Sequence, residues 1–319
     1  MYTKSIETIE ELKKLHDSPL MTLVSQAHAV HKQFHNLEEV QVCNLISIKT
    51  GGCPEDCKYC AQSSFYATGV KAEPMLSLEK VLEEAKKALA RGATRICLGA
   101  ALREVRDGRQ FEEILSMVKA ITELGVEVCC TLGMLKESQA ERLKEAGLYA
   151  YNHNLDSSEN FYKTIITTRS YEDRLRTLDV VEKAGIGVCC GAILGMGETV
   201  EDRLAFLLTL AKRDPLPQSI PINRLTAVKG TPLEGASPLS FWDMLRMIAC
   251  TRLVIPQAMI RLSSGRIEMS YEMQALSFFA GANSIFMGEK LLTVANSSVD
   301  QDEQMFSLLG LRKKRAFSS

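Results

Sequence analysis

The sequence predicts an α/β fold: a (β/α)8 barrel of the TIM type in a single domain, with an N-terminal helical extension. Two observations favour it. One pattern recurs along the chain: a segment with helical periodicity, then a glycine, then a short apolar run. Several of the segments between the apolar runs begin with a helix-capping motif. Strands separated by crossover helices run parallel, and eight such units close into a barrel of about 250 residues, which 319 residues accommodate.

Eight apolar segments have the length and composition of strands. Five of them contain a glycine that suits the left-handed residue at the end of a helix, followed by the apolar run: 90–100, 123–133, 145–156, 183–195 and 279–288. The other three are 43–51, 219–228 and 260–266.

Helix starts are predicted where a capping hydroxyl stands three residues before an acid. These hydroxyls belong to Ser138, Ser170, Thr199 and Ser240. We expect residues 1–40 to form the helical extension, 41–310 the barrel, and 311–319 a basic, solvated C-terminal tail.

An open, doubly wound sheet is the alternative architecture. Such a sheet usually carries a glycine-rich phosphate loop after its first strand. Here a cysteine-rich loop follows the first predicted strand. The barrel is therefore favoured.

Composition excludes several classes of partner. The 38 Lys and Arg against 39 Asp and Glu give a net charge of -1, without the basic excess that nucleic acid or an anionic membrane surface attracts. No apolar run approaches the roughly 18 residues of a membrane span. The N-terminal segment lacks the apolar stretch of a signal peptide, so we expect a cytoplasmic protein.

Three of the ten cysteines form a C-x3-C-x2-C array directly after the first strand: Cys53, Cys57 and Cys60. In a reducing cytosol, clustered thiols indicate metal ligands or catalytic groups. Three thiolates leave one position of a soft metal centre open, and the loop would lie at the barrel rim where active sites form. A zinc knuckle completed by Cys43 or a histidine is the alternative, although no histidine lies within ten residues of the loop.

Further cysteines lie on the second, third and fifth predicted strands. They are Cys97, the pair Cys129 and Cys130, and the pair Cys189 and Cys190. Side chains alternate between lumen and helix layer, so one member of each pair faces inward, and alternation does not say which. A lone strand cysteine is usually a buried hydrophobe. Three on neighbouring strands beside a cysteine loop favour a second site.

Polar residues mark the fourth predicted strand. Asn152, Asn154 and Asp156 fall two apart and so share one face, which conflicts with a plain packed core and indicates a cavity for a polar ligand. His153 falls on the opposite face of the strand, and we expect it to be packed or hydrogen-bonded to the backbone. The histidines at 28, 31 and 35 are interpreted as a partly solvated helix stripe.

Three strings occur in order: GGCPEDCKYCAQSS (51–64), YNHNLD (151–156) and GAILGMGE (191–198). With them, the chain resembles the radical S-adenosylmethionine superfamily, and within it the family that inserts sulfur into dethiobiotin. The resemblance implies that Cys53, Cys57 and Cys60 hold a 4Fe–4S cluster whose fourth iron binds S-adenosylmethionine. One-electron reduction then yields a 5′-deoxyadenosyl radical. A radical barrel enzyme without sulfur insertion, and a non-enzymatic zinc or redox barrel, are the alternatives.

The same resemblance implies a 2Fe–2S cluster that donates sulfur. Its ligands would be Cys97, Cys129, Cys189 and Arg261. Arg261 has a second interpretation as a counter-ion, because a guanidinium cation has no lone pair to donate. No role is predicted for Cys43, Cys130, Cys190 and Cys250.

Cofactor and substrate contacts also follow from the resemblance. It implies S-adenosylmethionine contacts from Tyr59, Asn154, Asp156, Arg174, Gly191 and Ile193. It implies dethiobiotin contacts from Asn152, Asn154 and Asn223, with no catalytic residue beyond the cluster ligands. The further partners implied are a flavodoxin-like or ferredoxin-like electron donor, iron–sulfur assembly proteins and a second copy of the chain in a homodimer.

Overall fold

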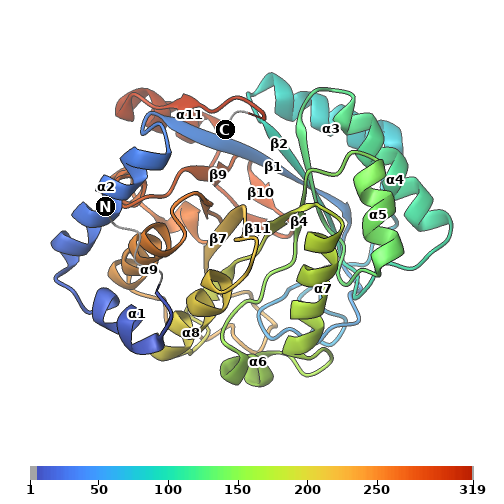
Figure 1. The fold of residues 1–319 in the computed structure, drawn as a ribbon. Helices are drawn as coiled ribbons and strands as arrows, with labels where there is room; N and C mark the ends of the chain where they lie inside the picture. The colour runs from blue at the N-terminus through green and yellow to red at the C-terminus, as the bar shows by residue number, and fades with distance from the viewer. Residues whose placement is uncertain (1–5, 318–319) are drawn as a thin grey trace.

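The structure is a computed structural model that describes residues 6–317. Its barrel has eight parallel strand positions, which follow one another in chain order (Figure 1). Each strand pairs with the next, and β9 pairs with β1 to close the ring. The strands are β1 (Glu39–Lys49), β2 (Arg95–Ala100), β3 (Glu127–Thr131), β4 (Ala150–Asn152), β5 (Gly187–Cys189) continued by β6 (Ala192–Leu194), β7 (Ser219–Arg224), β8 (Met259–Leu262) and β9 (Ser284–Phe286). The predicted (β/α)8 barrel is confirmed.

Helices cover the outside of the barrel (Figure 1). They are α3 (Leu78–Ala90), α4 (Arg109–Thr122), α5 (Glu137–Glu145), α6 (Glu159–Ile165), α7 (Tyr171–Lys183), α8 (Val200–Ala211), α9 (Phe241–Val254), α10 (Tyr271–Phe279) and α11 (Val299–Leu309). The five glycines that the repeat singled out have φ between 67° and 119°, as a left-handed helix end requires. The apolar faces of strands and helices meet in one continuous outer core.

Two of the four predicted helix caps are confirmed, and at the other two the capping contact differs from the prediction. Ser170 and Thr199 each form a full capping box. Ser240 caps α9, but it accepts from the backbone N–H of Trp242. Ser138 is not a cap, because α5 begins at Glu137 and Ser138 already lies in its first turn. The side chain of Gln139 accepts from the N–H of Lys136 at this end of the helix.

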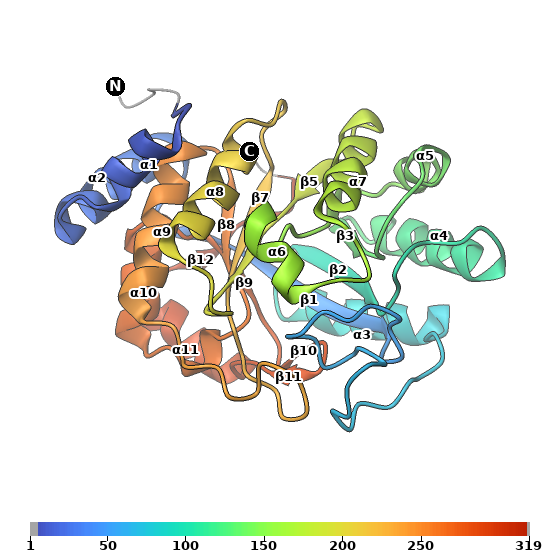
Figure 2. The ribbon, with the colours of Figure 1, turned by 90° about the horizontal axis from the view of Figure 1, so that it is seen from below.

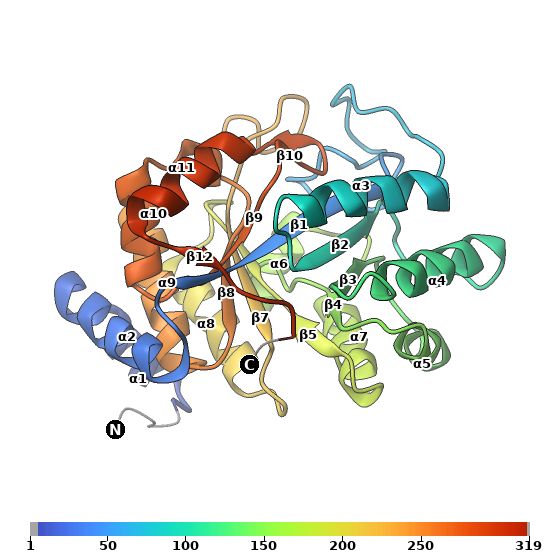
Figure 3. The same cartoon turned by 90° about the horizontal axis from the view of Figure 1, so that it is seen from above.

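The N-terminal extension consists of two helices, α1 (Ile9–His16) and α2 (Leu20–Phe34). They pack against α8 and α9 on the outside of the barrel, as Figures 1 and 3 show from two sides. The predicted helical extension is confirmed.

The histidine stripe of α2 faces the barrel more than its spacing predicted. His28 stacks on Phe279 with 3.8 Å between ring centroids, and His35 lies 2.7 Å from a guanidinium nitrogen of Arg252. His31 between them is only 2 % exposed, so the expected solvated stripe is wrong for this residue. Burial, with Arg252 and the two neighbouring histidines, lowers the pKa of His31 to about 2.

We expect His31 to make the fold acid-sensitive. Its folded-state pKa is depressed, so the unfolded chain binds the extra proton below pH 6.5, and stability is lost as pH falls from there toward 2. At pH 5 the loss from this one group is about 2 kcal/mol. Urea unfolding of His31→Gln at pH 7 and pH 5 should show a smaller decrease than in the unaltered protein. Parallel decreases in both proteins would contradict the assignment.

The C-terminal segment is docked rather than free. β12 (Arg312–Lys313) pairs in parallel with Glu39 and Val40 of β1 (Figure 3). The N–H of Phe317 donates to Glu127 at 3.0 Å. The described part of the tail is thus paired with the barrel through its backbone, while its side chains remain half-buried or exposed. The physical reason is that β1 extends below its neighbours, so its backbone groups there need hydrogen-bond partners.

Candidate active site

A cavity of about 330 Å³ opens where the barrel strands end. Its wall is formed by the loop after β1, the segments after β4, β7 and β8, and the hairpin of β10 (Lys290–Leu291) and β11 (Val294–Ala295). Figure 2 shows this hairpin beside the loop after β1. Parallel strands direct the loops that follow them to one rim, which is where barrel enzymes place their active sites.

The cysteine loop turns back on itself at this rim, and Cys53, Cys57 and Cys60 all line the cavity. Its turn needs a glycine at position 51: φ is 71°, and an added Cβ would lie 2.5 Å from the carbonyl oxygen of Lys71. Within the loop, the N–H of Cys60 donates to the carbonyl of Cys57 at 2.9 Å. Backbone constraints therefore fix the three thiols on one side of the cavity.

Burial raises the pKa of Cys57 to about 12 and that of Cys60 to about 11. Thiolates at these positions therefore need a bound cation. Among the described residues, no three His, Cys, Asp or Glu side chains converge on a point that one metal ion would fill. A 4Fe–4S cluster with three cysteine ligands places each thiolate on a different iron, so its thiols need not converge on a single metal ion.

A second group of thiols lies deeper, inside the lumen. Cys43, Cys97, Cys129 and Cys189 form one buried cluster, whereas Cys130 and Cys190 belong to the outer core. The inward member of each adjacent pair, which alternation leaves open, is thus Cys129 and Cys189.

The lumen thiols contact one another in series. Cys97 interacts with the thiols of Cys43 and Cys129, and Cys129 with that of Cys189. A hydrogen bond from the Cys129 thiol, aided by Arg261 and the hydroxyl of Ser219, lowers the pKa of Cys189 to about 6 against the effect of burial. The Cys129 thiol and the Arg261 guanidinium thus each favour the thiolate form of Cys189.

Arg261 points into this thiol cluster and is almost fully buried. Its Nε donates to Ser284 Oγ at 3.0 Å, and a terminal nitrogen donates to Ser219 Oγ at 3.2 Å and Gln41 Oε1 at 3.3 Å. The other terminal nitrogen lies 3.7 Å from Cys189 Sγ. The guanidinium is also stacked on the ring of Phe286, at 4.9 Å from its centroid.

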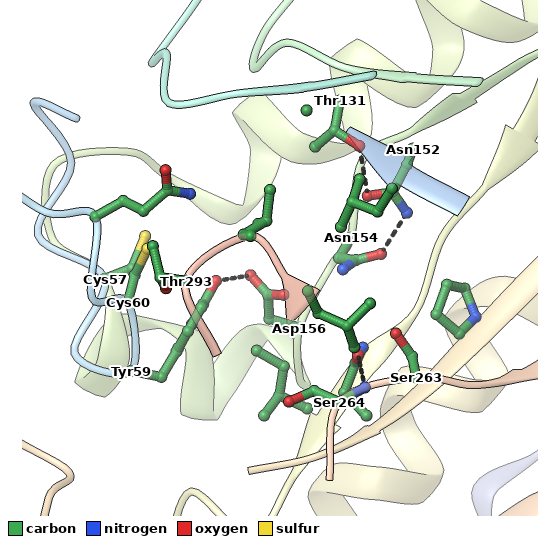
Figure 4. Close-up of a pocket in the computed structure, with 18 of the residues that line it drawn as sticks. Cys57, Tyr59, Cys60, Thr131, Asn152, Asn154, Asp156, Ser263, Ser264 and Thr293 are labelled. Atoms are coloured by element: carbon green, nitrogen blue, oxygen red, sulfur yellow. Dashed lines mark hydrogen bonds between the residues drawn. The ribbon is translucent and has the colours of Figure 1, made fainter. Parts of the chain in front are cut away.

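Asn152 and Asn154 form a linked pair on the cavity wall (Figure 4). The hydroxyl of Thr131 donates to Asn152 Oδ1 at 3.2 Å, and Asn152 Nδ2 donates to Asn154 Oδ1 at 2.9 Å. Strand β4 ends at Asn152, so the predicted strand to residue 156 is too long. Asn154 and Asp156 reach the cavity from the loop that follows.

Asp156 lies between the cysteine loop and the polar wall, with Tyr59 reaching it across the cavity (Figure 4). The Tyr59 hydroxyl and a terminal nitrogen of Arg174 each donate to Asp156 Oδ2 at 2.7 Å. The φ of Asp156 is 67°, a conformation that a non-glycine residue holds only where its surroundings enforce it. Arg174 also donates to the carbonyl of Asn154 and the hydroxyl of Tyr162, so it orients this corner.

The remaining predicted contacts are Ile193 of β6, Asn223 of β7 and Gly191, which precedes β6 and is not among the residues that line the cavity. Ile193 and Asn223 are register partners and both line the cavity, and Asn223 Nδ2 donates to the carbonyl of Ala192 at 3.0 Å. At Gly191 an added Cβ would lie 2.1 Å from the carbonyl oxygen of Pro221. Packing between strands therefore already accounts for a glycine there.

Two features of the site were missed from the sequence. Cys43 shares the inward parity of Leu45, which was the available signal, but the only role considered for it was as the fourth ligand of a zinc knuckle. Arg169 lines the cavity with a buried Nε that has no partner among the described atoms, and no motif around it pointed there.

Two family profiles match the sequence: the radical SAM superfamily over residues 47–210, and the biotin and thiamin synthesis associated domain over residues 221–312. A biotin synthase of Chlamydia abortus is 59% identical, over 98% of this chain and 94% of that protein. A biotin synthase of Flavobacterium johnsoniae is 51% identical, over 99% and 87%. The chain belongs to the biotin synthase family. As a member of that family it is a radical S-adenosylmethionine enzyme, and its radical SAM domain implies a 4Fe–4S cluster and S-adenosylmethionine as cofactors.

A solved structure of methylornithine synthase shares the fold of this biotin synthase family member, with a TM-score of 0.81. It is 19% identical and the match covers 98% of this chain and 95% of that chain. Among the described residues of this family member, no helix has the length and apolar character to cross a membrane.

Proposed function

We propose that this enzyme converts dethiobiotin to biotin by inserting sulfur from a 2Fe–2S cluster in the lumen. Cys53, Cys57 and Cys60 would hold the 4Fe–4S cluster. The lumen cluster would be held by Cys97, Cys129 and Cys189, with Arg261 beside them. The observation that supports this best is that thiols of both groups line one cavity.

The chain's own residues fit the ligands of such a reaction. When bound, the 4Fe–4S cluster and S-adenosylmethionine supply a hydrogen-abstracting radical, and the lumen cluster supplies sulfur. The Asp156 carboxylate, fixed by Tyr59 and Arg174, is an acceptor suited to ribose hydroxyls. Gly191 and Ile193 would lie along the adenine.

The substrate side of the cavity would be formed by asparagines. Asn154 Oδ1 already accepts two hydrogen bonds, from Asn152 and the N–H of Gly191, which leaves its Nδ2 to donate to a ureido carbonyl. Asn152 and Asn223 would flank the same ring. With cofactor and substrate bound, the walls would shield the reacting atoms from water, which would prevent quenching of a radical. This reaction requires no general base from the protein.

The function is tested by anaerobic loading with iron and sulfide, followed by reduction in the presence of S-adenosylmethionine and dethiobiotin. We expect biotin, with one 5′-deoxyadenosine for each carbon–hydrogen bond broken. Formation of 5′-deoxyadenosine without biotin would instead support a radical enzyme that does not insert sulfur. Bound zinc and no cleavage of S-adenosylmethionine would support a non-enzymatic barrel.

The proposal extends to the partners and the cellular setting. A flavodoxin-like or ferredoxin-like protein would donate electrons, iron–sulfur assembly proteins would load the clusters, and the enzyme would act as a homodimer in the cytoplasm. The ten cysteines are all free thiols, which supports a reducing compartment. Residues 41–310 would form one catalytic unit.

A further inference from the structure

We propose that Asp56 is a positioning residue for the 4Fe–4S cluster. Its carboxylate ties the cysteine loop to residues 166–169, the segment between α6 and α7, and so holds the loop thiols in place before iron binds. Asp56 stands directly before Cys57 in the chain. The inference rests on the proposed function in one respect, because it requires that Cys53, Cys57 and Cys60 hold this cluster.

The Asp56 carboxylate is occupied by the segment after α6, which lies beside the cysteine loop (Figure 2). It accepts the N–H of Thr167 at 2.9 Å and that of Thr168 at 3.2 Å, and the hydroxyl of Thr167 also donates to it. The hydroxyl of Thr168 lies 3.0 Å from the same carboxylate. Hydrogen bonds to an ionised acceptor are roughly twice as strong as neutral ones, so this is a firm attachment.

Backbone hydrogen bonds join the two segments on both sides of Cys57. The N–H of Asp56 donates to Thr168 Oγ1 at 3.2 Å. The N–H of Lys58 donates to the carbonyl of Ile165 at 3.1 Å. Cys57 therefore stands between two residues whose backbone is already fixed.

Arg103, which follows β2, braces the same junction. One of its terminal nitrogens lies 3.3 Å from the buried Glu55 carboxylate and also donates to the carbonyl of Thr168. The Thr168 hydroxyl contacts the carboxylates of both Glu55 and Asp56, and with a single proton it donates to one of them at a time. Three segments of the barrel rim thus meet at Thr168.

The junction fixes the thiols relative to the cavity. Arg169, the residue after Thr168, lines the cavity together with Cys57 and Cys60. Asp56 therefore holds two parts of the cavity wall in one unit. Backbone that is already ordered loses no further conformational entropy when a ligand binds, so this junction should strengthen binding of the cluster.

The test compares Asp56→Ala, Thr168→Val and Thr168→Ser with the unaltered protein. Valine keeps the shape of threonine without its hydroxyl, and serine restores the hydroxyl. Asp202→Ala is the matched control, because the Asp202 carboxylate accepts the N–H of Thr199 at 2.9 Å and the hydroxyls of Thr199 and Ser158, away from the cysteine loop.

Three measurements separate positioning from general stability. The first is the rate at which a chelator removes iron from the 4Fe–4S cluster, followed by electron paramagnetic resonance of the reduced cluster. The second is hydrogen exchange of peptides spanning residues 53–62 in the iron-free protein. The third is the free energy of unfolding in urea.

We expect Asp56→Ala and Thr168→Val to lose iron from this cluster about 10- to 100-fold faster than the unaltered protein. Exchange of residues 53–62 should be faster in the same two variants, and slow in the iron-free unaltered protein. Thr168→Ser should restore slow loss of iron. Asp202→Ala should keep slow loss even where its free energy of unfolding falls.

Equal rates of iron loss in Asp56→Ala and the unaltered protein would overturn the inference and leave the proposed function standing. Equally fast loss in Asp202→Ala would show that general stability sets the rate, which also overturns it. Fast exchange of the loop in the iron-free unaltered protein would mean that the junction forms only after loading. If Asp56→Ala does not fold, the two Thr168 variants decide alone. Absence of a 4Fe–4S signal in the loaded unaltered protein would instead overturn the proposed function.

Discussion

Replacing Cys57 by alanine is expected to abolish reductive cleavage of S-adenosylmethionine. Cys57 is one of three thiols that the loop after β1 turns toward the cavity, and its pKa of about 12 means that it becomes a thiolate only against a bound cation. Removing one of three protein ligands leaves two irons of the 4Fe–4S cluster without a protein bond. We therefore expect loss of about four irons per chain and 5′-deoxyadenosine formation no higher than in iron-free protein.

Cys130→Ala is the matched control for this experiment. Its thiol is also buried, but it packs in the outer core and not toward the cavity. Iron content and cleavage should stay close to those of the unaltered protein. Equal loss of cleavage in both variants would mean that Cys57 acts through folding alone. The measurements are iron analysis and chromatography of 5′-deoxyadenosine.

The barrel could be predicted because its signals are local. A glycine such as Gly185 ends a helix through its own φ, and a capping box such as that of Ser170 needs only three residues. The pairing of the C-terminal segment was not predicted, because the deciding contact is distant in sequence. The segment after Leu311 pairs with β1, whose free backbone no local pattern reveals.

The residues of the candidate site likewise include some that a local pattern predicted and others that it did not. The spacing of Cys53, Cys57 and Cys60 is local and was sufficient to place three thiols on one loop. The choice of Cys129 over Cys130 depends on how the strands tilt and pair around a closed barrel, which alternation within one strand does not determine. The same holds for Cys43, which meets Cys97 only because β1 and β2 are neighbours.

The ion pair that Arg174 forms with Asp156 was not predicted from the sequence either. Arg174 was predicted only as a contact of S-adenosylmethionine, and it does line the cavity. Its ion pair with Asp156 depends on the loop after β4, where Asp156 has a positive φ that no sequence pattern indicates.

Asp156→Asn is expected to have the second large effect, on both stability and cofactor binding. The Asp156 carboxylate compensates the charge of the buried Arg174, with 2.7 Å between the bonded atoms. Removing one partner of a buried ion pair costs about 3–5 kcal/mol of the free energy of unfolding. Loss of a charged acceptor for a ribose hydroxyl should in addition weaken S-adenosylmethionine binding by about 10- to 100-fold.

Asp302→Asn separates these two effects. Asp302 lies on α11 away from the cavity and compensates the buried Arg266 through bonds of 2.5 and 2.8 Å. It should lose a similar free energy of unfolding in urea titrations, yet bind S-adenosylmethionine with unchanged affinity in calorimetry of the iron-loaded, folded protein. If both variants kept that affinity, Asp156 would be a structural partner of Arg174 and nothing more. If both lost it equally, the weaker binding would follow from destabilisation, and the ribose contact would have to come from another residue of the cavity wall.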